Sequence, residues 1–397
     1  MFKECFCHPQ KQSQMILKDI VLRENHFNIG SVFIRFTEVF TELRSSRARN
    51  EFLEQIDKLI DWRPFQTLIN KKLNKRAEAK GEPTYDGVLM FKILLLETWY
   101  NLSDRAVEER VNDSISFGKF LDIGMEHVSP DHSTICRFRN AIVEKDLWNK
   151  LLSLLNKQLQ RHGIMKIETG ALVDASIVDS PYAPDGSVKI KVAEDREDTR
   201  SEEAKEEERS YQVKVGSAKP GVDTEARWVV KCKKFRYGYK KHVLTDGEGL
   251  VHTLTTASAN VSDTTEFPTL IEKGALQKGV MVLADKGYTS KANREHLTGH
   301  GLKDGIMRKA IKGKPLSDKD KEFNRQISQY RNKIERTFGS IRRWFHGGRC
   351  RYRGLAKTHA QNILEAICYN IKRAPQLYLN KLLENEEASI RGALVMR

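Results

Sequence analysis

A change of hydrophobic pattern near residue 168 constrains the fold of this chain more than any other feature. Before that point apolar residues recur at helical spacing, and after it short β-branched runs alternate with amphipathic stretches. The second part of the chain follows the order strand, hairpin, helix, strand, helix, strand, helix. This order predicts an α/β unit that is built on one mixed sheet with helices on its faces.

The strands of this unit are short runs, and a turn joins two of them. The sequence DGEG, residues 246–249, predicts a hairpin between the second run and the third. Helical segments follow the third, fourth and fifth runs. The runs themselves are ALVDASIV, FRYGYKKHVLT, LVHTLTTA, VMVLADKGY and DGIMRKA. The same order of elements is found in a ribonuclease-H-like nuclease core.

A highly charged segment interrupts this unit at about residues 190–215. Because it contains few apolar residues, we expect a solvated insert and not a packed element. The chain therefore divides into a helical domain over residues 1–160, the α/β domain over residues 168–375, and a C-terminal tail over residues 376–397.

The region before residue 160 consists of short helices with polar caps. The segment YDGVLMFKILLLETWY is apolar almost all round, which predicts a buried helix. Ser103, Ser114 and Asp131 are expected to cap the three helices that follow, and Gly124 is expected to end one of them.

The helix that begins after Asp131 opens with residues suited to reading DNA, namely His132, Ser133, Arg137 and Arg139. Short helices, tight turns and a basic helix start are typical of a helix-turn-helix reader. A plain helical bundle without DNA contacts explains the same pattern equally well.

The formal net charge of the 397-residue chain is +15 at pH 7. A surplus of this size favours polyanions, nucleic acid above all, although a basic protein without such a partner has the same composition. The six cysteines are scattered, and no apolar run reaches membrane-spanning length. We therefore expect a reduced, cytoplasmic protein without a membrane partner. Cys5, Cys7 and His8 lie close together, but no second half of a zinc site follows them.

Three acidic residues lie where this fold could assemble a metal site. Asp174 is inside the first strand, Asp285 ends the fourth, and Glu335 is on the long helix expected over residues 319–345. If the two strands are neighbours, both aspartates reach one edge of the sheet. Magnesium prefers oxygen ligands, and paired divalent ions support phosphodiester chemistry. Each acid alone has an ordinary interpretation as a cap or a surface ion pair, but together they predict a metal site.

At this point the sequence resembles a known family. The segments ALVDAS, VLADKGYTS and YRNKIERTFGSIRRW are similar to the three signatures of the DDE transposases of bacterial insertion sequences, most closely the IS5 family. The hairpin region and the helical region that ends in PDHSTICRFR are also similar. The resemblance covers about residues 60–375. It implies an enzyme that binds the ends of its element, hydrolyses the strands, and joins the 3′ ends to target DNA.

The resemblance also implies roles for individual residues. Asp174, Asp285 and Glu335 would hold Mg²⁺ or Mn²⁺, and the DNA partners would be terminal inverted repeats and target DNA. A homodimer would hold the two joined ends. Candidates for contact with the DNA backbone are the basic residues Arg331, Arg342, Lys240 and Lys286.

Two positions depart from the signature around Glu335. The family has a tyrosine seven residues before the glutamate, where this chain has Ser328, and a lysine seven residues after it, where this chain has Arg342. Arginine binds phosphate with a different geometry from lysine. The departures concern the contact with phosphate and leave the three acids in place.

Two other functions fit the same residues. One is a DNA-binding protein, inactive or domesticated, whose catalytic core has decayed, and the other is a ribonuclease-H-like nuclease without strand transfer. All three acids are present, which favours an active enzyme. Metal-dependent nicking of end DNA excludes the first alternative, and a joined product excludes the second.

Overall fold

The computed structural model describes most of the chain after residue 49. The described residues are 50–73, 85–123, 128–184, 221–231, 234–311, 313 and 315–395. The charged insert, the cluster of Cys5, Cys7 and His8, and Gly124 lie outside these ranges. The described residues of Phe52–Arg397 belong to one compact unit. None of the described helices is long and apolar enough to cross a membrane.

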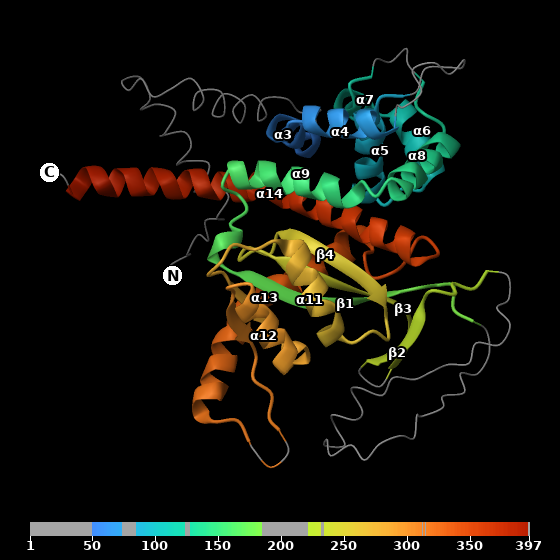
Figure 1. The fold of residues 1–397 in the computed structure, drawn as a ribbon. Helices are drawn as coiled ribbons and strands as arrows, with labels where there is room; N and C mark the ends of the chain where they lie inside the picture. Colours follow the sequence, from blue (N-terminus) through green and yellow to red (C-terminus); the bar gives the residue numbers. More distant parts are fainter. Residues whose placement is uncertain are drawn as a thin grey trace, which may run out of the picture. The chain divides into compact units, whose positions relative to one another are not determined.

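Short helices precede the sheet, as the sequence predicts (Figure 1). The predicted buried helix is α5, and nearly all of its residues are buried. Within it the Lys92 ammonium donates hydrogen bonds to Asp57 at 2.6 Å and to the Phe120 carbonyl at 2.8 Å, which satisfies a buried cation. The helices are α3 (Glu51–Leu59), α4 (Arg63–Leu73), α5 (Gly87–Trp99), α6 (Asp104–Asp113), α7 (Ile115–Leu121), α8 (His132–Glu144) and α9 (Trp148–Arg161).

The predicted N-caps are present. Ser103, Ser114 and Asp131 each accept a hydrogen bond from a backbone N–H in the first turn of α6, α7 and α8. The end of α7 differs from the prediction, because the helix stops at Leu121 and Asp122 adopts the left-handed conformation with φ of 56°. Aspartate visits this conformation more readily than most residues, so no glycine is required there.

The sheet is mixed. Its order is β2-β3-β1-β5-β6, and β4 also pairs with β3. β3 is antiparallel to β1, β2 and β4, whereas β5 is parallel to both β1 and β6. This arrangement confirms the predicted ribonuclease-H-like plan. The strands are β1 (Ala171–Asp179), β2 (Arg227–Lys231), β3 (Lys234–Thr245), β4 (Val251–Ser258), β5 (Met281–Ala284) and β6 (Lys303–Ile306).

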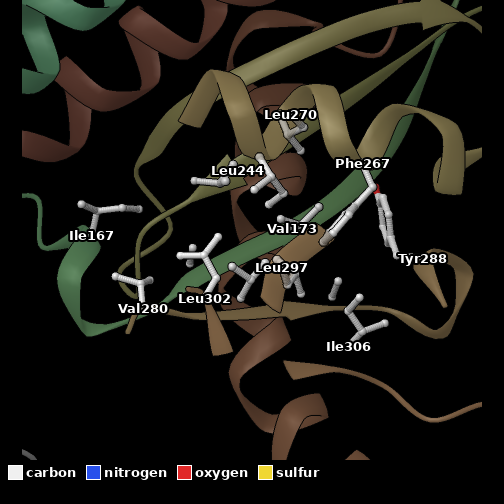
Figure 2. Close-up of a cluster of buried hydrophobic side chains, with 14 residues drawn as sticks. Ile167, Val173, Leu244, Phe267, Leu270, Val280, Tyr288, Leu297, Leu302 and Ile306 are labelled. Atoms are coloured by element: carbon white, nitrogen blue, oxygen red, sulfur yellow. The ribbon is translucent and has the colours of Figure 1, made fainter. Parts of the chain in front are cut away.

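One face of the sheet is covered by α11 (Asp263–Gly274) and α12 (Lys291–Gly299). Between these helices and the strands lies a cluster of buried apolar side chains (Figure 2), among them Val173, Leu244 and Phe267. Successive side chains of a strand point to opposite faces. Since Val173 belongs to this cluster, its neighbour Asp174 must point to the other face.

That other face carries α13 (Asp318–Phe345), which contacts β1 and β5. The sequence of this helix predicts a buried apolar stripe of Ile327, Tyr330, Ile334, Phe338, Ile341 and Phe345, and all of these except Tyr330 are buried. The prediction for Tyr330 was wrong, because this residue is 59% exposed and Thr337 takes the inward position. Both residues lie within four positions of Ile334, so helical spacing alone does not separate them. Thr337 is held inside by its hydroxyl, which donates to the Gly249 carbonyl at 2.7 Å.

The last helix, α14 (Leu355–Val395), packs on β4 and also on α5, α8, α9 and α13. The sequence assigns residues 376–397 to a tail, but the helix continues through Pro375 to Val395. Proline inside a helix removes one backbone hydrogen bond, so other contacts must favour the continuation. The Lys381 ammonium donates to the His162 carbonyl at 2.6 Å, and Tyr378 lies edge-on to the His162 ring.

Candidate active site

The fold brings the two predicted aspartates to adjacent positions. Val173 of β1 is aligned with Ala284 of β5 in the parallel pairing, so Asp174 and Asp285 follow as the next residues on neighbouring strands. The sequence made their proximity conditional on this pairing, and the structure confirms it. Asp285 itself lies just past β5, where its carboxylate accepts a hydrogen bond from the Lys286 N–H at 2.6 Å.

Arg331 of α13 joins all three acids. Its guanidinium lies 3.0 Å from the Asp174 carboxylate, 3.4 Å from Asp285 and 3.9 Å from Glu335. The side chain of Arg331 is 14% exposed, so these ion pairs are shielded from water more than surface pairs are. Residues far apart in the sequence therefore form one electrostatic group.

The three carboxylates differ in burial. The side chain of Asp174 is 17% exposed, that of Asp285 is 35% exposed, and that of Glu335 is 58% exposed. Asp174 is therefore the most deeply buried of the three acids. Burial raises the pKa of Asp174, and the charge of Arg331 and the hydrogen bond from the Ala175 N–H oppose that rise. The pairing with Arg331 offsets the cost of burying this charge.

The donor set fits a hard divalent cation. All three side chains offer carboxylate oxygens, the ligands that Mg²⁺ and Mn²⁺ prefer. The ligand atoms of these three acids do not all lie within 4.8 Å of one another. Among the described residues, one group of a different composition has its ligand atoms that close together. Arg331 lies among the acids, so the same carboxylates serve either the guanidinium or a cation.

The basic residues near the acids have different environments. Arg342 is exposed, and its guanidinium donates to the Ser176 hydroxyl at 2.6 Å, on the same face of β1 as Asp174. Lys286 is exposed beside Asp285. The Lys240 ammonium is bound internally, to Asp263 and to the Val261 carbonyl, both at 2.8 Å. Any phosphate that Lys240 contacts must compete with Asp263.

Sequence reasoning missed a buried polar pair on the opposite face of the sheet, formed by His242 of β3 and Tyr288. The His242 ring lies 3.2 Å from the Tyr288 hydroxyl and 4.0 Å from Asp263. Burial lowers the pKa of His242 to about 4 and raises the pKa of Tyr288 well above its usual value. Both side chains are therefore neutral at neutral pH. In the sequence, Tyr288 stands three residues after Asp285, in the segment VLADKGYTS. This closeness to a candidate metal ligand is the signal by which Tyr288 could have been found.

The predicted recognition helix α8 presents only part of its basic set. Arg137 is exposed, and its guanidinium donates to the Ser133 hydroxyl at 2.7 Å. His132 is partly exposed, and its Nδ1 lies 2.9 Å from the Glu108 carboxylate. His132, Ser133 and Arg137 are thus placed near the surface at the start of the helix.

Arg139 corrects the prediction for this helix. It is only 6% exposed, and its guanidinium is paired with Glu97 at 2.6 Å and with Asp104 at 2.5 Å. A step of two residues turns a helix by about 200°, so Arg139 cannot share the exposed face of Arg137. Arg139 lies with Ile135 and Ile142 on the inward stripe, and its role is structural.

The fold and the site define a class of enzyme, a ribonuclease-H-like core with three carboxylates from two adjacent strands and a helix. Comparison with known proteins supplies the family. Residues 169–371 match the family described as Transposase DDE domain, and residues 41–141 match the family described as Transposase domain (DUF772). The chain belongs to the DDE transposase family, and the first match contains all three acids.

A curated relative agrees with this assignment. The transposase for insertion sequence element IS1106 of Neisseria meningitidis serogroup B is 38% identical over 240 residues, which are 60% of this chain and 76% of that protein. The further prediction that the chain belongs to the IS5 family stays a prediction.

Solved structures were also compared. The alignment with the Mos1 strand transfer complex covers 85% of this chain and 98% of the Mos1 chain, with 11% sequence identity and a TM-score of 0.19. The alignment with the Mos1 paired-end complex with the left transposon end covers 94% of this chain and 98% of the Mos1 chain, with 10% sequence identity and a TM-score of 0.20. Because these TM-scores are low, the assignment of the chain to its family rests on the sequence matches and not on the solved structures.

Proposed function

We propose that Asp174, Asp285 and Glu335 hold divalent ions, Mg²⁺ or Mn²⁺, with which this transposase cleaves the ends of its own element and joins the 3′ ends to target DNA. One observation carries the proposal: three carboxylates from β1, from the end of β5 and from α13 lie against a single guanidinium. Acids that repel one another are grouped in this way where a cation is bound.

The bound ions would supply activation of the attacking hydroxyl and stabilisation of the leaving oxygen. The protein positions the acids. Asp174 and Asp285 each accept a hydrogen bond from the next residue's backbone N–H, at 2.8 and 2.6 Å, which fixes one oxygen of each carboxylate. The second oxygen of Asp174 is bound by Arg331. A cation held by that oxygen would compete with the guanidinium of Arg331, which would then be available to bind phosphate.

Arg342 is the second candidate for a phosphate contact. The Ser176 hydroxyl holds its guanidinium on the face of β1 that carries Asp174. A guanidinium offers two parallel donors to a phosphate. We therefore assign Arg331 and Arg342 to the scissile strand, with Lys286 at the exposed rim.

Recognition of the element ends is assigned to the helical region before residue 160, through His132, Ser133 and Arg137 of α8. These residues are at least partly exposed at the start of a capped helix, the part that a helix-turn-helix reader inserts into the major groove. Two ends must meet for joining, so we propose a homodimer as the active assembly. Analytical ultracentrifugation with element-end DNA tests this: a complex with two chains supports it, and a single-chain complex that joins DNA contradicts it.

The catalytic assignment is tested with substitutions that remove one charge and little volume. We expect Asp174→Asn, Asp285→Asn and Glu335→Gln each to abolish Mg²⁺-dependent cleavage of labelled element-end DNA, while end binding changes less than threefold. Glu322→Gln is the matched control, because Glu322 lies on α13 and pairs only with nearby exposed residues. It should cleave like the wild type.

The outcomes separate the candidate functions. Wild-type cleavage by any of the three variants removes that residue from the metal set. End binding by the wild type without cleavage in Mg²⁺ or Mn²⁺ supports the inactive DNA-binding protein. Cleavage without a joined product supports the nuclease.

A further inference from the structure

A second cluster of ligand-type side chains lies outside the acidic site. Glu272, His296 and His300 place one ligand atom each within 4.8 Å of the others, which no other trio of the described residues does. We propose that these three residues form a Zn²⁺ site that links α11 to α12. The site is separate from the proposed catalytic function and stands or falls independently of it.

The secondary structure sets up the cluster. His296 and His300 are four residues apart at the end of α12, so they project from the same side of the helix. Their ring centroids are 4.3 Å apart. Glu272 comes from the last turn of α11, which contacts α12. Two helices that pack together thus contribute two imidazoles and one carboxylate.

The hydrogen bonds of the two histidines leave a ring nitrogen of each available to bind a metal ion. His300 Nδ1 lies 2.9 Å from the carbonyl of His296, so it carries the proton and donates. This tautomer leaves the His300 Nε2 lone pair available, an arrangement that proteins use to orient metal-binding histidines. His296 Nε2 is buried and makes no hydrogen bond, and Glu272 Oε1 lies 3.9 Å away from it.

The donor set selects the metal. Two imidazole nitrogens and one carboxylate oxygen match the ligands of zinc sites, which use His and Asp or Glu in tetrahedral geometry. Mg²⁺ prefers oxygen ligands alone and does not suit this cluster. Water or one further ligand completes the four positions. Small changes of side-chain rotamer suffice, since the ligand atoms are already close and Glu272 is exposed.

The cluster is distant from the carboxylate site along α11. Asp263 begins this helix, and its carboxylate lies near Gly287 in the segment after Asp285. Glu272 is nine residues further on, or about 13 Å at 1.5 Å per residue. Both helices cover the apolar cluster shown in Figure 2. A metal between their ends would tie the end of α12 to the end of α11.

The test measures tightly bound Zn²⁺ in the full-length protein after dialysis against zinc chloride. We expect His296→Gln, His300→Gln and Glu272→Gln each to lose one Zn²⁺ per chain relative to the wild type. Glu295→Gln, on the same helix but outside the cluster, and His346→Gln, at an exposed histidine, are matched controls and should retain it. Asp285→Asn should also retain it, which separates this site from the carboxylate site.

Two further measurements keep the result interpretable. Circular dichroism and thermal melting in EDTA establish that each variant is folded, and Zn²⁺ should raise the melting temperature of the wild type but not of the cluster variants. Co²⁺ should give visible absorption typical of tetrahedral coordination in the wild type only. An unchanged zinc count in His296→Gln and His300→Gln, with folded protein, overturns the proposal.

Discussion

At the scale of residues, Arg331 is the side chain on which the acidic site depends. It carries the positive charge next to Asp174, Asp285 and Glu335, and it is largely buried. Breaking a buried ion pair is costly because the partner charge is left uncompensated. The acid trio and its arginine therefore behave as one unit, in which a bound cation and the guanidinium compete for the same oxygens.

We expect Arg331→Gln to lower the free energy of unfolding by about 3 kcal/mol in EDTA, because Asp174 loses its partner. Mg²⁺ should stabilise this variant more than it stabilises the wild type, since the competing guanidinium is gone. Urea unfolding with and without Mg²⁺ measures both effects. Arg325→Gln, which removes an exposed pair with Glu322 on the same helix, should change stability by less than about 1 kcal/mol. An equal Mg²⁺ response in Arg331→Gln and wild type contradicts the competition.

A second residue-scale prediction concerns His242, which is fully buried. Burial lowers its pKa to about 4 in the folded protein, while the nearby Asp263 opposes this and Lys240 reinforces it. The unfolded chain therefore binds the proton first as the pH falls. The stabilisation is complete above about pH 6.5 and is lost between about pH 6.5 and pH 4, by on the order of 3 kcal/mol.

Urea unfolding between pH 7.5 and pH 5 measures this loss. We expect His242→Gln to show a shallower dependence of stability on pH than the wild type, whatever its stability at neutral pH. His346→Gln, at an exposed histidine, should keep the wild-type slope. An unchanged slope in His242→Gln would assign the pH dependence to other groups.

At the scale of elements, α8 shows how one helix divides its basic residues between two roles. Arg137 is exposed beside Ser133, whereas Arg139 is buried against Glu97 and Asp104. Burial raises the pKa of Glu97, and Arg139 opposes this rise. The exposed arginine is available to DNA and the buried one holds α8 against α5 and α6.

Substitution of these two arginines should therefore give opposite results. Arg137→Ala is expected to reduce the preference for element-end DNA over random DNA, by the equivalent of about 1–3 kcal/mol if it reads a guanine, with little change in stability. Arg139→Ala should lower the free energy of unfolding by about 3–5 kcal/mol, because the buried Glu97 then keeps only the longer contact with Arg351, at 3.5 Å. Competition binding and urea unfolding measure the two effects. Equal loss on both DNAs would make Arg137 a phosphate contact only.

At the scale of the whole molecule, the net charge of +15 governs the interaction with DNA. Each phosphate that a Lys or Arg neutralises releases counterions, so the logarithm of the binding constant falls linearly with the logarithm of salt concentration. We expect a slope that corresponds to several phosphate contacts on random DNA. Binding measured by fluorescence anisotropy between 50 and 200 mM salt (roughly the range in which such slopes are resolved) tests this. A flat dependence would separate the charge of the chain from DNA binding.

The sequence alone determined the three acids and the order along the chain of the strands and helices that follow residue 168, except for β2, which it did not predict. Each strand after residue 168 is a short run with its own turn or cap, so local patterns were sufficient to find β1, β3, β4, β5 and β6. The capping residues of α6, α7 and α8 were also visible, because a cap is made within one helical turn. These features depend on neighbours in the sequence.

Tertiary structure decided the features that depend on residues far apart in the chain. The burial of Arg139 depends on Glu97 and Asp104, and the extension of α14 past Pro375 accompanies contacts with His162. The three acids lie together only because β1 pairs with β5 and α13 crosses both strands. Charge pairing and packing act through space, so the sequence indicated which acids to consider, and the long-range contacts placed Arg331 among them.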